Sequence, residues 1–241
     1  MGTSVRYPRW EMTDIEQGNM DANKKRTIGN IETEAKKYFV DASGCHDFTH
    51  VERVRALALR IGRAEKADLF VLEAAALLHD IAKNDEMRKK GEFCHATEGA
   101  VLARPILEAA GADEKTIDCI VHCIATHRKR GKNVPESLEA KILFDADKLD
   151  SLGAVGIGRV FLFAGMAGSK TLYTGHEQEF AKHDKDYSYT KEDSVFLEYE
   201  QHLKHLKDRM LTKTGKMIAK ERSDYMRDFF RQFWKEVRGN D

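Results

Sequence analysis

The sequence predicts an almost entirely helical fold. Only three prolines interrupt the 241 residues, and the segments between them are rich in Ala, Leu, Glu, Lys and Arg, which are strong helix formers. Alternating stretches of Val, Ile, Thr and Tyr bounded by Asn-Gly or Asp-Gly turns are nearly absent. We therefore expect an all-α protein, folded as a compact multi-helix bundle.

The first segments divide into an arm and two helices. Residues 1–25 are polar and end in KKR, which predicts a flexible N-terminal arm before a single helical domain over residues 26–241. A first helix is expected at about residues 27–40. The next, in DFTHVERVRALALRIGRAE, has Asp47 or Thr49 as its N-cap. His50 recurs on the face of that helix that carries its apolar residues, namely Val54, Leu57 and Ile61.

The stretch ADLFVLEAAALLHDIAK predicts a helix from Lys66 to about Lys83, and it raises a question of chemistry. Its apolar residues Leu69, Leu72 and Ala76 recur at helical spacing, and His79 continues their face into the core. An unpaired polar group inside a protein costs a few kcal/mol. Some interaction must therefore compensate for burying the histidine and the aspartate that follows it.

The middle of the chain predicts further helices. CHATEGAVLARPILEAAG should kink or restart near Pro105 and end at Gly111, and DEKTIDCIVHCIATHRKRGK should close on a basic tail and Gly131. PESLEAKILFDADKLDSLGAVGIGRVFLFAG follows, with Pro135 at the first helical position. An acidic cluster is embedded among apolar residues in this last stretch.

The rest of the chain alternates between irregular and amphipathic stretches. Residues 168–194 have weak periodicity and many polar residues, so we expect a loop or insertion that can cover a site. Amphipathic stretches at about 195–213 and 215–238 finish the chain.

Composition limits the function classes. The 40 Lys and Arg residues balance the 40 Asp and Glu residues, so no net field attracts nucleic acid or another polyanion. The longest apolar stretches are far shorter than the roughly 20 residues of a membrane span, and the N-terminus has no apolar signal-peptide core. Four cysteines do not make a disulfide framework. These features predict a cytoplasmic location.

Four polar groups interrupt the apolar helical faces, and together they predict a metal centre. They are His50, the adjacent pair His79 and Asp80, and one aspartate of DADKLD. Two imidazoles and two carboxylates form a mixed nitrogen and oxygen set that suits a borderline or hard divalent metal, which would offset the cost of burial. Helical spacing leaves Asp145 and Asp147 both open as the fourth ligand, because each shares a face with apolar residues.

The strings DFTHVERV, LLHDIAK and DADKLDSLGAVGIGRVF, in this order, resemble the HD-domain metal-dependent phosphohydrolases, and the small stand-alone HD hydrolases most of all. The resemblance runs from about residue 30 to the C-terminus and implies an HD-type helical domain. It implies His50, His79, Asp80 and Asp147 as metal ligands, because Asp147 matches the family's Ala-Asp-x-Leu string. Asp145 is the alternative, or a partner that orients a histidine.

Binuclear relatives in the superfamily carry extra histidines between the His-Asp pair and the last aspartate. CHATEGAVL resembles one such element, and IATHR stands where a second would be, with Thr126 beside a single histidine. His95 and His127 are therefore candidates to contact a second metal or the substrate. Lys83, four residues after His79, is a candidate to hold a phosphate oxygen, with Arg159 and Lys148 as weaker ones.

The resemblance implies hydrolysis of a phosphoester, in a nucleotide or a small phosphorylated metabolite, by metal-activated water. Asp80 and Lys83 would be the catalytic residues, and the cofactor a divalent ion of Mn, Fe, Mg, Zn, Co or Ni. The expected partner is that small substrate, with no membrane and no extended nucleic acid. The alternatives are an inactive ligand-binding or regulatory HD protein, a binuclear HD oxygenase, and a nuclease, which the neutral charge balance disfavours.

Overall fold

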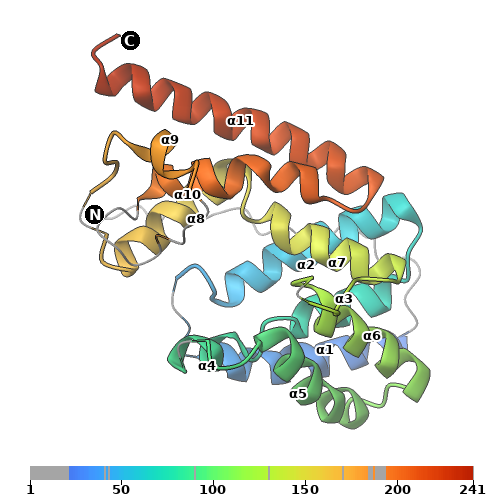
Figure 1. Cartoon of the computed structure of the whole chain (residues 1–241). Coiled ribbons are helices and arrows are strands. Elements are labelled where there is room, and N and C mark those ends of the chain that lie inside the picture. Colours follow the sequence, from blue (N-terminus) through green and yellow to red (C-terminus); the bar gives the residue numbers. More distant parts are fainter. Residues whose placement is uncertain are drawn as a thin grey trace, which may run out of the picture.

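The computed structural model describes residues 22–40, 42, 44–89, 91–129, 131–169, 171–183, 187 and 194–240. The all-α prediction is confirmed, since the described residues form helices and no strand (Figure 1). Most of the arm predicted over residues 1–25 lies outside the described residues. The elements, in chain order, are α1 Ala22–Lys36, η1 Lys37–Phe39, α2 Phe48–Glu65, α3 Leu69–Leu78, α4 Lys83–Arg88, α5 His95–Ala109, α6 Glu114–Thr126, α7 Leu138–Leu149, α8 Gly153–Met166, α9 Glu177–Phe180, α10 Val195–Gln201, η2 Leu203–Arg209 and α11 Lys213–Val237.

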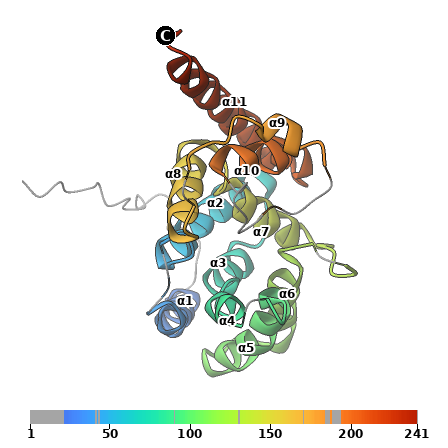
Figure 2. The same ribbon diagram turned by 60° about the vertical axis from the view of Figure 1, so that its left-hand side comes forward.

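Helix α3 lies at the centre of the bundle. Nine of its ten residues are buried, and it packs against α1, α2, α6 and α7, which surround it (Figure 2). A helix that is apolar all round has no face to offer to water, so it is stable only when neighbouring helices cover it. His79 and Asp80, which follow its last apolar turn, therefore lie in the interior.

Side-chain caps fix where most of these helices begin. Asp47, one of the two predicted caps of α2, accepts a hydrogen bond from the His50 backbone N–H at 3.2 Å. Asp68, Asp113 and Ser137 cap α3, α6 and α7 in the same way. Each cap satisfies a backbone donor that the first helical turn leaves unpaired.

The prediction that one helix runs to Lys83 was wrong. Helix α3 ends at Leu78, and a tight turn follows in which the N–H of Ile81 donates to the Leu78 carbonyl and that of Lys83 to the Asp80 carbonyl. Helix α4 then begins at Lys83. The turn replaces the regular helical spacing, so that the neighbouring side chains of His79 and Asp80 both enter the interior.

The prediction that Pro135 occupies the first helical position was wrong, because α7 begins at Leu138. Ser137 caps α7, and α8 leaves at a bend of 65°. Gly153 starts α8 with a φ of +75°, a conformation that glycine adopts without the steric cost other residues meet. Among the described helices none can span a membrane alone, although α7 and α8 together reach the required length and apolarity.

Helix α5 continues through Pro105, where a kink or restart was expected, and ends before Gly111, which has a φ of +82°. The carbonyl that a proline ring displaces belongs to the residue four positions earlier. Here that residue is Val101, which is 65% exposed, so water can donate a hydrogen bond to its carbonyl.

The C-terminal part forms a second layer over α2, α7 and α8. Helix α11 packs against these three helices and η2, and it crosses the top of the molecule in Figure 1. The described part of residues 168–194 contains α9. Tyr173, which precedes α9, packs edge-on against Phe196, Phe233 and Trp234. That part of the predicted loop therefore lies against α10 and α11.

Candidate metal centre

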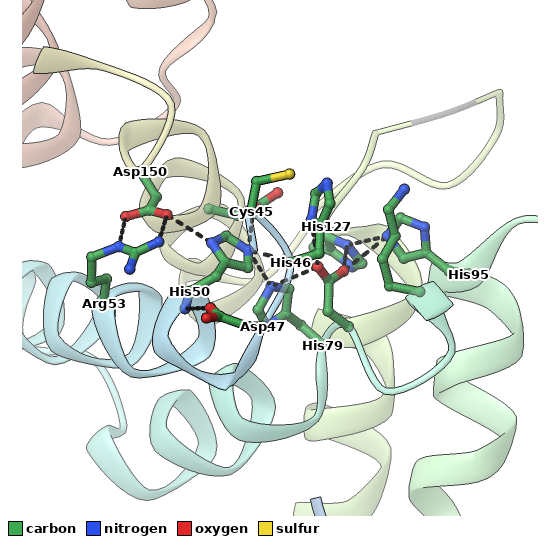
Figure 3. A network of polar contacts seen from close by, with 12 residues as sticks. Cys45, His46, Asp47, His50, Arg53, His79, His95, His127 and Asp150 are labelled. Carbon is green, nitrogen blue, oxygen red and sulfur yellow. Dashed lines mark hydrogen bonds and ion pairs between the residues drawn. The ribbon is translucent and has the colours of Figure 1, made fainter. Parts of the chain in front are cut away.

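Six candidate residues come together from separate elements, most of them at helix ends. His50 lies in the first turn of α2, His79 and Asp80 directly after α3, His95 at the start of α5, His127 directly after α6, and Asp147 near the end of α7. Helix ends that meet in the interior bring such residues together across long sequence distances. Figure 3 shows the imidazoles of His50, His79, His95 and His127 gathered at one place.

His50, His79 and Asp147 form what we call the Asp147 group. The Nε2 atoms of the two imidazoles are 3.3 Å apart, and Nε2 of His50 is 3.5 Å from an oxygen of Asp147. All three ligand atoms lie within 4.8 Å of one another, which is the separation expected of ligands to one ion.

The hydrogen bonds behind the two imidazoles fix their tautomers. Nδ1 of His79 donates to the Ala76 carbonyl at 2.8 Å, and Nδ1 of His50 donates to Asp150 at 2.7 Å. In each neutral ring the other nitrogen, Nε2, then carries a lone pair. Two lone pairs face each other beside two carboxylates, an arrangement that repels itself unless a cation lies between them. The residues present therefore fit a divalent metal.

Asp80, His95 and His127 form the Asp80 group, which repeats this plan. Nε2 of His95 is 3.2 Å from Nε2 of His127 and 3.0 Å from an oxygen of Asp80. Nδ1 of His127 donates to the Ile124 carbonyl at 2.7 Å, and Nδ1 of His95 lies 2.6 Å from Glu86. These three residues also present ligand atoms within 4.8 Å of one another.

The carboxylate of Asp80 lies between the two groups. Its Oδ1 faces His95 and His127, whereas its Oδ2 is 3.6 Å from Nε2 of His50 and 3.7 Å from Nε2 of His79. One carboxylate can ligate two ions through its two oxygens. The geometry thus allows one or two metals to be held by this cluster.

Electrostatics favours the ionised forms of Asp80 and Asp147 and the neutral forms of His50 and His127. Burial raises the pKa of the Asp80 carboxyl, but the imidazoles around it, led by His79, hold the pKa well below its usual range. The pKa of Asp147 is also lowered, because Lys148 and the histidines outweigh the effect of burial. Burial lowers the pKa of His127 to about 4 and lowers that of His50. Metal ligands need these protonation states.

The two aspartates that the sequence left open have different surroundings. Asp145 points away from the histidines and accepts hydrogen bonds from the backbone N–H groups of Leu211 and Thr212, both at 2.8 Å, and from the Thr212 hydroxyl. It therefore fixes the start of α11 against α7. Asp147 is the aspartate of DADKLD that faces His50.

Lys83 lies at the edge of the Asp80 group, although not on the same helix face as His79, because the turn after α3 separates them. Its ammonium pairs with Glu86 at 2.8 Å. Glu86 also forms an ion pair with Arg128 at 2.6 Å. The pKa of Glu86 falls to about 2, because Lys83 and His95 outweigh the effect of burial. Two cations are thus held beside the cluster by one buried acid.

The other two cations that the sequence suggested are also paired. Arg159 donates to Asp150 at 2.8 Å and to the Cys45 carbonyl at 2.9 Å, and Lys148 pairs with Asp147 at 2.6 Å. Lys148 therefore neutralises a candidate ligand in this arrangement.

Several residues that support the cluster were not predicted from the sequence. His46 lies 3.8 Å from Asp80, and its ring meets that of His50 edge-on. Arg53 binds both oxygens of Asp150, at 2.8 and 3.0 Å, and so holds the acid behind His50 (Figure 3). The signals were present, because His46 stands four residues before His50 and Asp150 three residues after Asp147, but periodicity alone gave them no role.

Comparisons with known proteins agree with this geometry. Residues 47–152, which contain all six candidate residues, match the HD domain family. The chain is 37% identical over 215 residues to the uncharacterized protein YpgQ of Bacillus subtilis, covering 88% of this chain and 94% of YpgQ. A crystal structure of YpgQ aligns with a TM-score of 0.68 at 30% identity, covering 91% of this chain and 100% of that one.

This chain aligns with nearly the whole of one further relative and with only a part of another. An HD-superfamily hydrolase from Bacillus thuringiensis aligns with a TM-score of 0.68 at 31% identity, over 89% of this chain and 98% of that one. Ribonuclease Y of Borrelia garinii subsp. bavariensis is 28% identical over 138 residues, which cover 57% of this chain and 24% of that enzyme.

An all-α bundle whose core carries a His, a His-Asp pair and a later Asp defines an HD domain. The chain belongs to the HD-domain family, and its relatives of known structure include an HD-superfamily hydrolase. The family resemblance inferred from the sequence is confirmed.

Proposed function

We propose that this protein is a metal-dependent phosphohydrolase that cleaves a phosphoester of a nucleotide or a small phosphorylated metabolite. The observation that carries the proposal is the set of lone pairs on His50 and His79 that face each other beside Asp147 and Asp80. A relative supports the nucleotide, because one crystal structure of YpgQ, at 30% identity, is a complex with ADP. The unpaired cysteines suit a cytoplasmic location, where such substrates are found.

The Asp147 group and Asp80 would hold a divalent metal. When bound, the ion lowers the pKa of a water molecule and polarises a phosphoryl oxygen. Asp80 would accept the proton of the attacking water, because its two oxygens face the imidazoles of both groups. Asp150 and the Ala76 carbonyl would keep the imidazoles oriented while charge shifts.

Lys83 and Arg128 would bind the phosphate at the edge of the Asp80 group. Glu86 holds both cations in place, and the incoming phosphate would share them with this acid. Charge-assisted hydrogen bonds to phosphate are roughly twice as strong as neutral ones, so they stabilise the charge of the transition state.

A binuclear HD oxygenase is the second candidate, because the Asp80 group offers two further residues, His95 and His127, and an oxygen of the shared Asp80 to a second ion. It predicts two redox-active iron ions per chain and oxygen uptake with an organic substrate. An inactive regulatory protein predicts metal or nucleotide binding without turnover, and a nuclease predicts cleavage of oligonucleotides at low salt.

The test is elemental analysis of the purified protein, followed by a panel of nucleotides and phosphomonoesters with the metal found. We expect phosphate or pyrophosphate release that a His50→Ala variant abolishes while its circular dichroism and unfolding temperature stay close to those of the wild type. If the panel yields no product with any divalent ion, the proposal fails. Unfolding of His50→Ala would instead indicate a structural metal.

A further inference from the structure

A cavity of about 250 Å³ opens beside the metal centre, between α8 and α10. Its lining is partly polar and partly apolar. The polar lining residues are Cys45, His46, Ser151, Arg159, Ser194 and Glu198, and the apolar side chains are those of Val160, Phe163, Ala164, Val195 and Leu203.

Two of the polar lining residues connect the cavity to the metal centre. His46 lines the cavity and lies 3.8 Å from Asp80, the carboxylate between the two groups. Arg159 lines the cavity too, and its guanidinium binds Asp150, the acid that orients His50. Figure 3 shows Cys45 and His46 directly beside the imidazole cluster. A molecule with one end at the metal centre can therefore extend into the cavity.

The same wall contains unusual unpaired polar atoms. Within the described part of the chain, only three buried side-chain polar atoms have no hydrogen-bond partner: Nδ1 of His46, Nε of Arg159 and Oγ of Ser223. Buried polar groups without a partner are rare because each one costs free energy. Two of the three belong to residues that line this cavity, and Nδ1 of His46 lies 3.8 Å from an oxygen of Asp80.

The apolar walls suit a flat ring. Phe163, 37% exposed, offers an aromatic face, and Val160 and Leu203 lie on the same cavity. Glu198, also on the lining, supplies a carboxylate that accepts hydrogen bonds from ring N–H groups. The volume is below the roughly 300–1,000 Å³ of pockets that enclose whole drug-sized ligands, so it suits one ring system with the remainder outside.

We infer that this cavity is the subsite for the base of a nucleotide, whose phosphates extend past His46 and Arg159 to the metal centre. The inference deepens the proposed function and rests on it. It assigns substrate selectivity to the α8 and α10 walls, whereas the chemistry belongs to the histidines and acids.

The test measures the binding of two ligands to the metal-loaded protein by calorimetry: α,β-methylene-ADP, whose α–β bridge resists hydrolysis, and methylenediphosphonate, which lacks the nucleoside. Ala164→Trp fills the cavity, and Phe163→Ala removes its aromatic wall. Val155→Trp is the control, because Val155 is on α8, 40% exposed, and outside the cavity lining.

We expect Ala164→Trp to weaken α,β-methylene-ADP at least about tenfold and Phe163→Ala about fivefold, the lower end of a typical base–aromatic contact. The Kd of methylenediphosphonate should differ by no more than about twofold among the wild type and the three variants. Unchanged binding of α,β-methylene-ADP to both cavity variants would overturn the inference. A parallel loss of both ligands in Phe163→Ala would overturn it too, since the base would then make no separate contribution.

Turnover by the wild type is scored separately. Base-dependent binding without cleavage of any phosphoester contradicts the proposed function and leaves the base subsite standing. If the protein cleaves nucleotides but the cavity variants bind α,β-methylene-ADP as tightly as the wild type does, the base subsite is contradicted and the proposed function is not.

Discussion

The Asp147 group and the Asp80 group each hold one imidazole by a backbone carbonyl and the other by a carboxylate. His79 and His127 donate to the carbonyls of Ala76 and Ile124, whereas His50 and His95 are paired with acids. Two arginines bind the acid behind His50, and a lysine and an arginine bind the acid behind His95. The same solution to orienting an imidazole thus appears twice in one cluster.

The two groups differ in their negative charge. The Asp147 group has a carboxylate of its own and also faces one oxygen of Asp80, whereas the three members of the Asp80 group include only the shared acid. A divalent cation gains more from two carboxylates than from one. We therefore expect the first metal to bind at the Asp147 group, and the Asp80 group to bind a second ion more weakly or to serve the substrate.

The largest effect should come from removing the acid that distinguishes the groups. Asp147→Asn should lower turnover on the order of 10³-fold and abolish tight metal binding, because the metal contributes several kcal/mol to the transition state. Titration with the activating metal, alongside steady-state kinetics, measures both effects.

Asp145→Asn is the matched control, two residues away on the same helix. It removes the charge of the acid that binds Leu211 and Thr212, the N-cap of α11, so it should destabilise the fold by roughly 1–3 kcal/mol while metal affinity is retained. Equal metal affinity in the two variants would mean that Asp147 is not a ligand.

The acids behind the imidazoles should have a smaller effect, and a different one in each group. Asp150→Asn should weaken the first metal by about 10–100-fold, as is typical when the partner of a ligating histidine is changed. Glu86→Gln should leave that first affinity nearly unchanged. Competition with a chelator measures the metal affinity of the two variants. A larger loss of affinity in Glu86→Gln than in Asp150→Asn would mean that the first metal binds at the Asp80 group.

The bend between α7 and α8 supports the Asp147 side only. A Cβ on Gly156 would collide with the Ser151 carbonyl, so Gly156→Ala should destabilise the protein by about 1–3 kcal/mol in urea unfolding. Gly158→Ala, in the same helix but facing open space, should instead stabilise by about 0.5–1 kcal/mol. Equal free energies of unfolding for the two variants would show that the bend tolerates a side chain.

The Asp80 group should make the metal-free protein sensitive to acid. Burial lowers the pKa of His127 from 6.5 to about 4, so between these values the unfolded chain binds the proton and the folded chain does not. The free energy of unfolding should therefore fall as the pH drops from about 6.5 to about 4, by up to roughly 1.4 kcal/mol per pH unit. Denaturation curves at several pH values measure this slope, which His127→Gln should reduce. An unchanged slope in that variant would show that His127 is not its source.

The smallest effect should come from Lys83. Its ammonium is already paired with Glu86, and Arg128 remains beside the same acid. Lys83→Ala should therefore lower kcat by only about tenfold, with metal affinity unchanged. A loss as large as that of Asp147→Asn would make Lys83 the main catalytic cation.

The fold class and the candidate ligands could be predicted because both depend on local patterns. Helix formers and apolar spacing reveal helices, and a polar residue on an apolar face, such as His50, signals an unusual interior. The choice between Asp145 and Asp147 needed the structure, because both lie among apolar residues and only tertiary contacts show that Asp145 binds Thr212, the N-cap of α11.

Two other features escaped the sequence for related reasons. The turn after Leu78 is invisible to periodicity, since the apolar run continues into Ile81 and Ala82, which are also buried. The supporting acids Asp150 and Glu86 stand among charged residues that usually face solvent. Asp150 is buried where α2, α7 and α8 meet, and Glu86 where α4 meets the start of α5 and the end of α6, which no single segment encodes.

The central claim is that the facing imidazoles of the Asp147 group hold a divalent metal. Elemental analysis of protein purified without chelators tests it most directly, when wild type and His79→Ala are compared after equal dialysis. The account predicts at least about one divalent ion per wild-type chain and only traces in the variant. Equal metal content in both proteins, or none in either after incubation with each divalent ion, would contradict it.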